Sequence, residues 1–97
     1  MRVHWTNKAI DHLLAIRDYA AQNSKIYADR LVDRLTRRSE QIGTFPKSGR
    51  MVPEYSREDI REVIERPYRI IYRIREEQID VLAVLHSAQQ LPPQIFE

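Results

Sequence analysis

The pattern of apolar and polar positions predicts one strand, two helices and then three strands. Residues 2–5 alternate between polar and apolar side chains, which predicts a short first strand. Thr6 can cap a helix, and apolar residues recur after it at spacings of three and four, which predicts a helix of roughly 15 residues ending near Asn23. A second amphipathic helix is predicted from about Ser24 to Gly43, where the glycine is expected to end it in a left-handed conformation.

Residues 60–87 contain three segments that predict strands, separated by two polar breaks. In residues 68–75 the even-numbered side chains are apolar and suit packing against helices. The odd-numbered positions of that segment hold three arginines and Ile71, and we expect them to face solvent or a partner. Residues 79–85 are apolar on both faces apart from Asp80, which predicts a central strand. A polar turn precedes them, so the last two strands are predicted to be antiparallel.

The element order β-α-α-β-β-β predicts an α+β fold, with an antiparallel helical hairpin packed on one face of a mainly antiparallel sheet. The length suits a single domain spanning residues 1–97. Residues 44–57 form a loop, which we expect its apolar side chains to hold against the domain: Phe45, Met51, Val52 and Tyr55. Ile95 and Phe96 are expected to pack back on the domain or to contact a partner.

Composition narrows the classes of function. The net charge is only +2, but the pI is about 9.2 and most basic residues are arginines, which favours anionic partners such as nucleic acid or an acidic peptide. The absence of cysteine excludes disulfides and thiolate metal sites. The longest apolar run, Val81–Leu85, is far shorter than the roughly 20 residues of a membrane-spanning helix. The start of the chain does not resemble a signal peptide, so we expect a cytoplasmic protein.

Neither a metal nor a cofactor is expected. The three histidines, His4, His12 and His86, are not spaced as metal ligands. The two glycines do not form a phosphate-binding loop. What remains is acid-base or charge-stabilising chemistry on an anionic partner.

Four arginines lie in the first two of the three predicted strand segments, and His86 ends the third: Arg61, Arg69, Arg73 and Arg75. Guanidinium groups bind phosphate through two parallel hydrogen bonds and stabilise developing negative charge. Histidine exchanges a proton near neutral pH. Arg61 with Arg69 or Arg73, and His86 nearby, would suffice to cleave RNA through its own 2′-hydroxyl. The alternative is a solvated surface on which arginines pair with neighbouring glutamates and His86 is structural.

Several segments, taken in order, carry a family resemblance: VHWTNKAIDHLLAIRDYAA, FPKSGRMVPEY, IREVIERPYRIIYRI and IDVLAVLHSAQQLP. Together they cover nearly the whole chain and resemble the RelE/ParE superfamily, the toxin half of bacterial toxin-antitoxin pairs. The resemblance implies a small toxin that a cognate antitoxin binds and neutralises in a hetero-oligomer. The antitoxin is implied to wrap the toxin and to cover its basic surface.

The superfamily contains two mechanisms. RelE-like members cut messenger RNA on the ribosome, and by position Arg61 and His86 match residues that this nuclease branch uses. ParE-like members instead poison DNA gyrase. The nuclease branch usually places a tyrosine or another base soon after that histidine, whereas Ser87-Ala88-Gln89-Gln90 follows here, and the ending resembles the ParE side.

We therefore interpret the chain as a ParE-like inhibitor of DNA gyrase. One alternative is a RelE-like interferase acting on the ribosome and messenger RNA, with Arg61, Arg73 and His86 as catalytic residues. A second alternative is an inactive, toxin-derived domain that only binds an antitoxin. In every case the residues expected to contact a partner are Arg61, Arg69, Arg73, Arg75 and His86.

Overall fold

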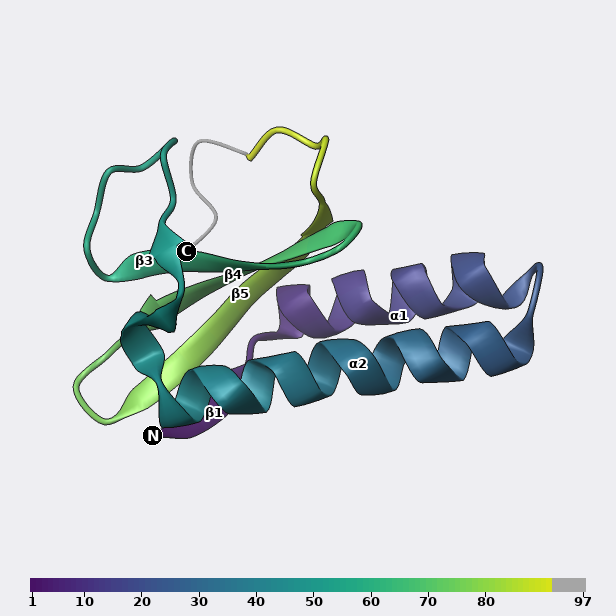
Figure 1. Ribbon diagram of the computed structural model, residues 1–97, viewed down its shortest axis with the longest axis horizontal. Coiled ribbons are helices and arrows are strands. Elements are labelled where there is room, and N and C mark those ends of the chain that lie inside the picture. The colour runs from purple at the N-terminus through teal and green to yellow at the C-terminus, as the bar shows by residue number, and fades with distance from the viewer. Residues whose placement is uncertain (92–97) are drawn as a thin grey trace.

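The computed structural model describes residues 1–91, in which a helical hairpin covers one face of a five-stranded sheet (Figure 1). The elements are β1 (Arg2–Trp5), α1 (Asn7–Ala21), α2 (Lys25–Thr44), the 3-10 turn η1 (Pro46–Ser48), β2 (Arg50–Met51), β3 (Ile60–Glu65), β4 (Tyr68–Ile74) and β5 (Gln78–His86). The predicted α+β class and the order of the six predicted elements are confirmed. β2 was not predicted, because two residues are too few to show a periodicity.

The sheet has the strand order β1-β5-β4-β3-β2. Neighbouring strands are antiparallel except for β1 and β5, which are parallel with Val3 opposite Ile79. The prediction of a mainly antiparallel sheet is therefore confirmed. β5 lies between β1 and β4 and is buried from Ile79 to Leu85, as predicted for a central strand. None of the helices among residues 1–91 is both long and apolar enough to cross a membrane.

Thr6 connects β1 to α1. Its hydroxyl oxygen accepts a hydrogen bond from the amide of Ala9 at 3.2 Å, which is the predicted N-cap. The same hydroxyl donates to the carbonyl oxygen of Val81 at 3.0 Å. The start of α1 is thereby fixed to the central strand, where apolar residues of both helices and of the sheet form the larger core.

Gly43 does not end α2 as expected. The helix continues to Thr44, and no glycine among residues 1–91 has a positive φ. A Cβ atom at Gly43 would lie 2.7 Å from the carbonyl oxygen of Met1 and 2.8 Å from a methyl group of Val3. The glycine is required here because β1 approaches the backbone of α2 too closely for a side chain.

The second face of the sheet is largely covered, which corrects the expectation that it is open. Arg69 and Ile71 on the odd-numbered face of β4 are both buried, because loop residues Val52 and Tyr55 pack over this face. The apolar residues there form a second cluster that includes Val52, Ile60, Ile71, Leu82 and Leu85.

The expectation that the apolar residues of the loop hold it in place is correct for Val52 and Tyr55 only. Phe45 is 66% exposed and Met51 is 45% exposed, so these two side chains do not anchor the loop. Ile95 and Phe96 lie outside the described residues.

Candidate functional site

Arg61 lies near the start of β3 and is half-buried. Its Nε donates to the carbonyl oxygen of Glu58 at 3.0 Å, and its Nη1 donates to that of Gly49 at 2.9 Å. Gly49 also donates its amide to the hydroxyl of Tyr72 at 3.1 Å, and that hydroxyl donates to the carbonyl oxygen of Pro46 at 2.6 Å. Arg61 and Tyr72 therefore fix the conformation of residues 46–49.

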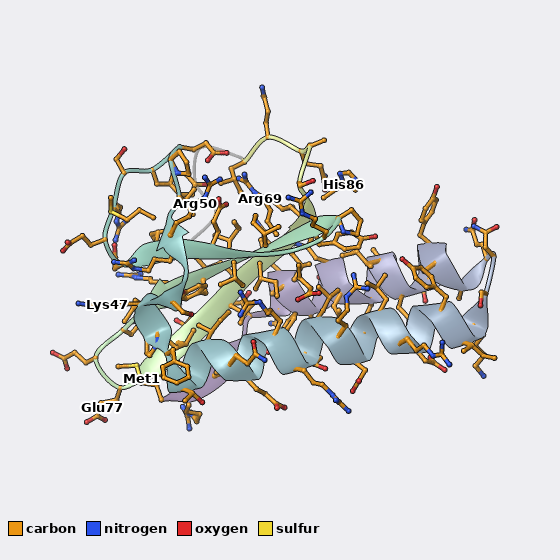
Figure 2. The ribbon with its side chains drawn as sticks, in the orientation of Figure 1. Met1, Lys47, Arg50, Arg69, Glu77 and His86 are labelled. Atoms are coloured by element: carbon orange, nitrogen blue, oxygen red, sulfur yellow. The ribbon has the colours of Figure 1, made fainter. Side chains whose placement is uncertain are left out.

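Arg69 is part of a buried network of charges. Its Nη2 donates to Glu54 at 2.8 Å, and its Nε lies 3.4 Å from a carboxylate oxygen of Glu62. The Glu62 side chain is fully buried and also accepts a hydrogen bond from Nε of Arg50 at 2.6 Å. The hydrogen bond from Arg69 lowers the pKa of Glu54 below its ordinary value. Figure 2 shows Arg50 and Arg69 on the same side of the sheet.

Arg73 and Arg75 are also neutralised by carboxylates. Nε of Arg73 lies 3.3 Å from Asp59. The hydrogen bond from Arg57 to the Asp59 carboxylate, at 2.7 Å, lowers the pKa of that group. Arg75 donates to the buried carboxylate of Asp80 at 3.2 Å. The charge of these arginines is thus largely balanced within the protein.

His86 is exposed at the end of β5. Its ring meets the ring of Tyr68 edge-on, with the centroids 5.9 Å apart. Its Nδ1 accepts a hydrogen bond from the amide of Ala88 at 3.2 Å, and its own amide donates to the side chain of Gln89 at 2.7 Å. These bonds form a tight turn after the strand.

The structure does not bring Arg61, Arg73 and His86 together. Arg61 is opposite Tyr72 in the sheet and His86 is opposite Tyr68, so both lie on the face of the sheet toward the helices. They are separated by four residues along β4, which is about 13 Å at the usual rise of a strand. Arg73 lies on the opposite face, where it contacts Asp59. A single phosphate group cannot contact all three side chains in this arrangement.

Two features of the site were not predicted from the sequence. Glu62 stands in phase with the apolar residues Ile60 and Ile64, and a carboxylate at such a position is a signal of a buried ion pair. The second feature is a cavity of about 600 Å³ at the end of α2, lined by Met1, Thr44, Phe45, Pro46, Lys47, Ser48 and Ile74. No sequence signal predicts the cavity, because it joins residues from three distant segments. Within residues 1–91, no group of three His, Asp or Glu side chains is arranged to hold a metal ion.

The fold and the charge-paired sheet define the class of small α+β proteins in which a helical hairpin lies on a five-stranded sheet. A family model described as the ParE toxin of type II toxin-antitoxin system, parDE, matches residues 3–91. The chain belongs to this ParE toxin family.

Individual relatives agree with the family. The chain is 32% identical over 88 residues to Toxin RelE2 of Caulobacter vibrioides, covering 91% of this chain and 97% of that protein. It is 31% identical over 91 residues to protein Y4kP of Sinorhizobium fredii, covering 94% and 93%. A solved structure titled "Chromosomal ParDE TA system from P. aeruginosa" superimposes with a TM-score of 0.74 at 24% identity, covering 89% of this chain and 95% of that one, which shows the shared fold.

Proposed function

We propose that this toxin poisons DNA gyrase in the cytoplasm by binding it, without cleaving a substrate of its own, until a cognate antitoxin neutralises the toxin. The observation that carries this proposal is the separation of Arg61, Arg73 and His86. A nuclease that acts through these residues would need its charge stabilisers and its proton carrier around one phosphate. Here they lie at two ends and on two faces of the sheet.

The pairing of the sheet arginines also supports a binding function. Arg69, Arg73 and Arg75 each have a carboxylate partner within the chain, so they are not poised to bind an RNA phosphate. Membership of the ParE family favours gyrase over the ribosome as the target. Association with an antitoxin in a hetero-oligomer follows from the same membership.

One induction experiment tests the target. The toxin is expressed without its antitoxin, and the same culture is assayed for cleaved DNA trapped on gyrase, for the SOS response and for transcripts cut within codons. We expect growth arrest with trapped DNA and SOS induction. Cut transcripts on translating ribosomes without trapped DNA would overturn the gyrase proposal, and normal growth despite verified folded protein would favour the inactive alternative.

The nuclease remains a second candidate because one similar protein bears the name Toxin RelE2. This alternative requires Arg61 and His86 in catalysis. Arg61→Lys and His86→Gln would then remove toxicity while the circular dichroism spectrum stays unchanged. Under the gyrase proposal both variants stay toxic, because binding needs no proton transfer at His86 and Lys keeps the positive charge of Arg61.

A further inference from the structure

The cavity at the end of α2 has the properties of a docking site. Phe45 is 66% exposed and Met1 is 52% exposed, although both are large apolar side chains at its wall. Ile74 at the end of β4 and Pro46 add to the apolar lining. Large apolar side chains left exposed around a concave surface indicate a binding site.

The backbone around the cavity is held by four hydrogen bonds, of which one is buried and three are partly buried. Residues 46–48 form one wall, and they are held by the Tyr72 hydroxyl, which is bonded to Pro46 and to Gly49. Arg61 holds the carbonyl of Gly49 from β3. A hydrogen bond from the amino group of Met1 to the carbonyl oxygen of Gly43, at 2.7 Å, holds the opposite wall. Because these bonds already fix the backbone of the wall, filling the cavity costs little backbone entropy, which favours binding.

The lining indicates the chemistry of the occupant. Its one charged side chain is Lys47, and the other polar side chains are the hydroxyls of Thr44 and Ser48. An apolar side chain fits the interior, and a carboxylate next to it complements Lys47. Glu76 and Glu77 lie in the turn that follows β4 and repel a carboxylate of the partner, whereas Lys47 attracts it.

The most exposed large apolar side chains away from this cavity lie at the far end of the helical hairpin. Tyr19 and Ile26 are 70% and 67% exposed there. The cavity on that part of the hairpin is lined by Arg17, Ala21, Lys25, Ala28 and Asp29 and includes neither of these side chains. At the hairpin end the exposed apolar side chains thus lie outside the cavity there, whereas Met1 and Phe45 line the cavity at the end of α2. Figure 2 places Met1 and Lys47 at the opposite end of α2 from the hairpin turn.

We propose that the cavity lined by Phe45, Lys47 and Ile74 receives an apolar anchor side chain of the cognate antitoxin, with an adjacent Asp or Glu of the antitoxin facing Lys47. The inference rests on the membership of a toxin-antitoxin family and is independent of whether gyrase is the target. A neutralising partner must dissociate slowly, and an anchor in a preformed apolar cavity slows dissociation.

The test measures binding of the purified antitoxin encoded next to the toxin gene, by calorimetry or interferometry. Phe45→Asp is expected to weaken binding at least about 30-fold, the factor that corresponds to a hot-spot residue. Lys47→Glu is expected to weaken it several-fold at low salt and less at high salt. The aspartate in Phe45→Asp lies next to the C-terminal end of α2, where a negative charge is unfavourable to the helix dipole. Phe45→Ser is a second variant that removes the aromatic ring without adding a charge. Ile26→Asp on the hairpin end is the matched control and should bind within about threefold of the natural protein.

Growth provides the second readout. Phe45→Asp should still arrest growth when expressed alone, and co-expressed antitoxin should no longer rescue the cells. Unchanged affinity in both Phe45 variants would overturn the inference, and so would a larger loss in Ile26→Asp than in Phe45→Asp. Loss of toxicity in both Phe45 variants with unchanged antitoxin affinity would assign the cavity to the target instead. Each of these outcomes is distinct from failure of the gyrase proposal, which appears as an absence of trapped DNA in the natural toxin.

Discussion

Glu62 stands on the same face of β3 as Ile60 and Ile64, and its side chain is fully buried. Arg50 comes to it from β2 and Arg69 from β4, so one carboxylate joins three strands. The sequence suggested that Arg69 belongs to a surface for an anionic partner, but the buried carboxylate of Glu62 pairs with it inside the protein. Burying a carboxylate is costly unless it stays paired, and the network is therefore sensitive to any change of its members.

Replacing Glu62 is predicted to destabilise the protein strongly. Glu62→Ala leaves the guanidinium of Arg69 buried with Glu54 as its remaining partner, and we expect a loss of about 3 kcal/mol in the free energy of unfolding. Denaturation by urea measures the loss. Arg37→Ala is the control, since its ion pair with Asp33 is exposed on both sides and should contribute within about 0.5 kcal/mol. A Glu62→Ala variant as stable as this control would contradict the role of the network.

His12 on α1 is the second residue whose protonation matters. Its Nδ1 accepts a hydrogen bond from the amide of Val84 at 3.2 Å, in the part of β5 that extends beyond its pairing with β1. Burial lowers the pKa of His12 below its ordinary value; nearby Lys8 lowers it further, and Asp11 opposes the shift. The folded protein thus holds a neutral histidine that the unfolded chain would protonate first.

We predict that stability falls as the pH drops below about 6.5, the pKa of an unperturbed histidine, toward the lower pKa of folded His12. Between these two pKa values the unfolded state binds more protons than the folded state. The stabilisation from neutral His12 is therefore fully present above pH 6.5 and is lost as the pH falls toward the pKa of folded His12. Urea midpoints measured between pH 7.5 and 5 test this dependence. His12→Gln keeps an acceptor for Val84 but does not titrate, so its midpoints should change less over the same range. An identical pH dependence in both proteins would rule out His12 as the cause. Carboxylates such as Glu54 and Asp59, whose pKa values are lowered, act only at more acidic pH.

At the scale of elements, the packing of α2 against β1 depends on Gly43. Helix propensity alone predicts that Gly43→Ala stabilises a helix by about 1 kcal/mol. The contacts of 2.7 and 2.8 Å that a Cβ would make with Met1 and Val3 oppose this gain, and we expect a net loss of about 1–2 kcal/mol. Thermal unfolding of Gly43→Ala beside Thr44→Ala, an exposed position one residue further, measures the difference. A stabilised Gly43→Ala would show that β1 moves away at little cost.

Sequence patterns were sufficient to predict which face of β4 packs against the helices. The even-numbered residues of β4 were predicted to face the helices because period-two alternation is a local property, and Ile70 and Tyr72 lie in the core shared with them. The opposite face was predicted incorrectly because Val52 and Tyr55, which cover it, lie more than ten residues away along the chain. Gly43 was misread for the same reason, since the strand that excludes a side chain there comes from the N-terminus.

At the scale of the whole molecule, the sequence predicted the class, the element order and the family, because motifs and periodicity persist over the whole chain. It could not predict the site in the same detail. Arg61 and His86 are joined to the fold by backbone carbonyls and amides, and such partners carry no signal in the side-chain sequence. The cavity beside Phe45 likewise depends on the meeting of β4, η1 and the first residue.

The pairing of the first strand with the last has a consequence for how the toxin is made. β5 supplies Ile79 and Val81 to one core cluster and Leu82 and Leu85 to the other, and it separates β1 from β4 in the sheet. A nascent chain that has not yet released these residues from the ribosome can form the hairpin of helices but neither core. Folding of the sheet is therefore delayed until β5 has emerged from the ribosome, because neither core cluster can close without this strand.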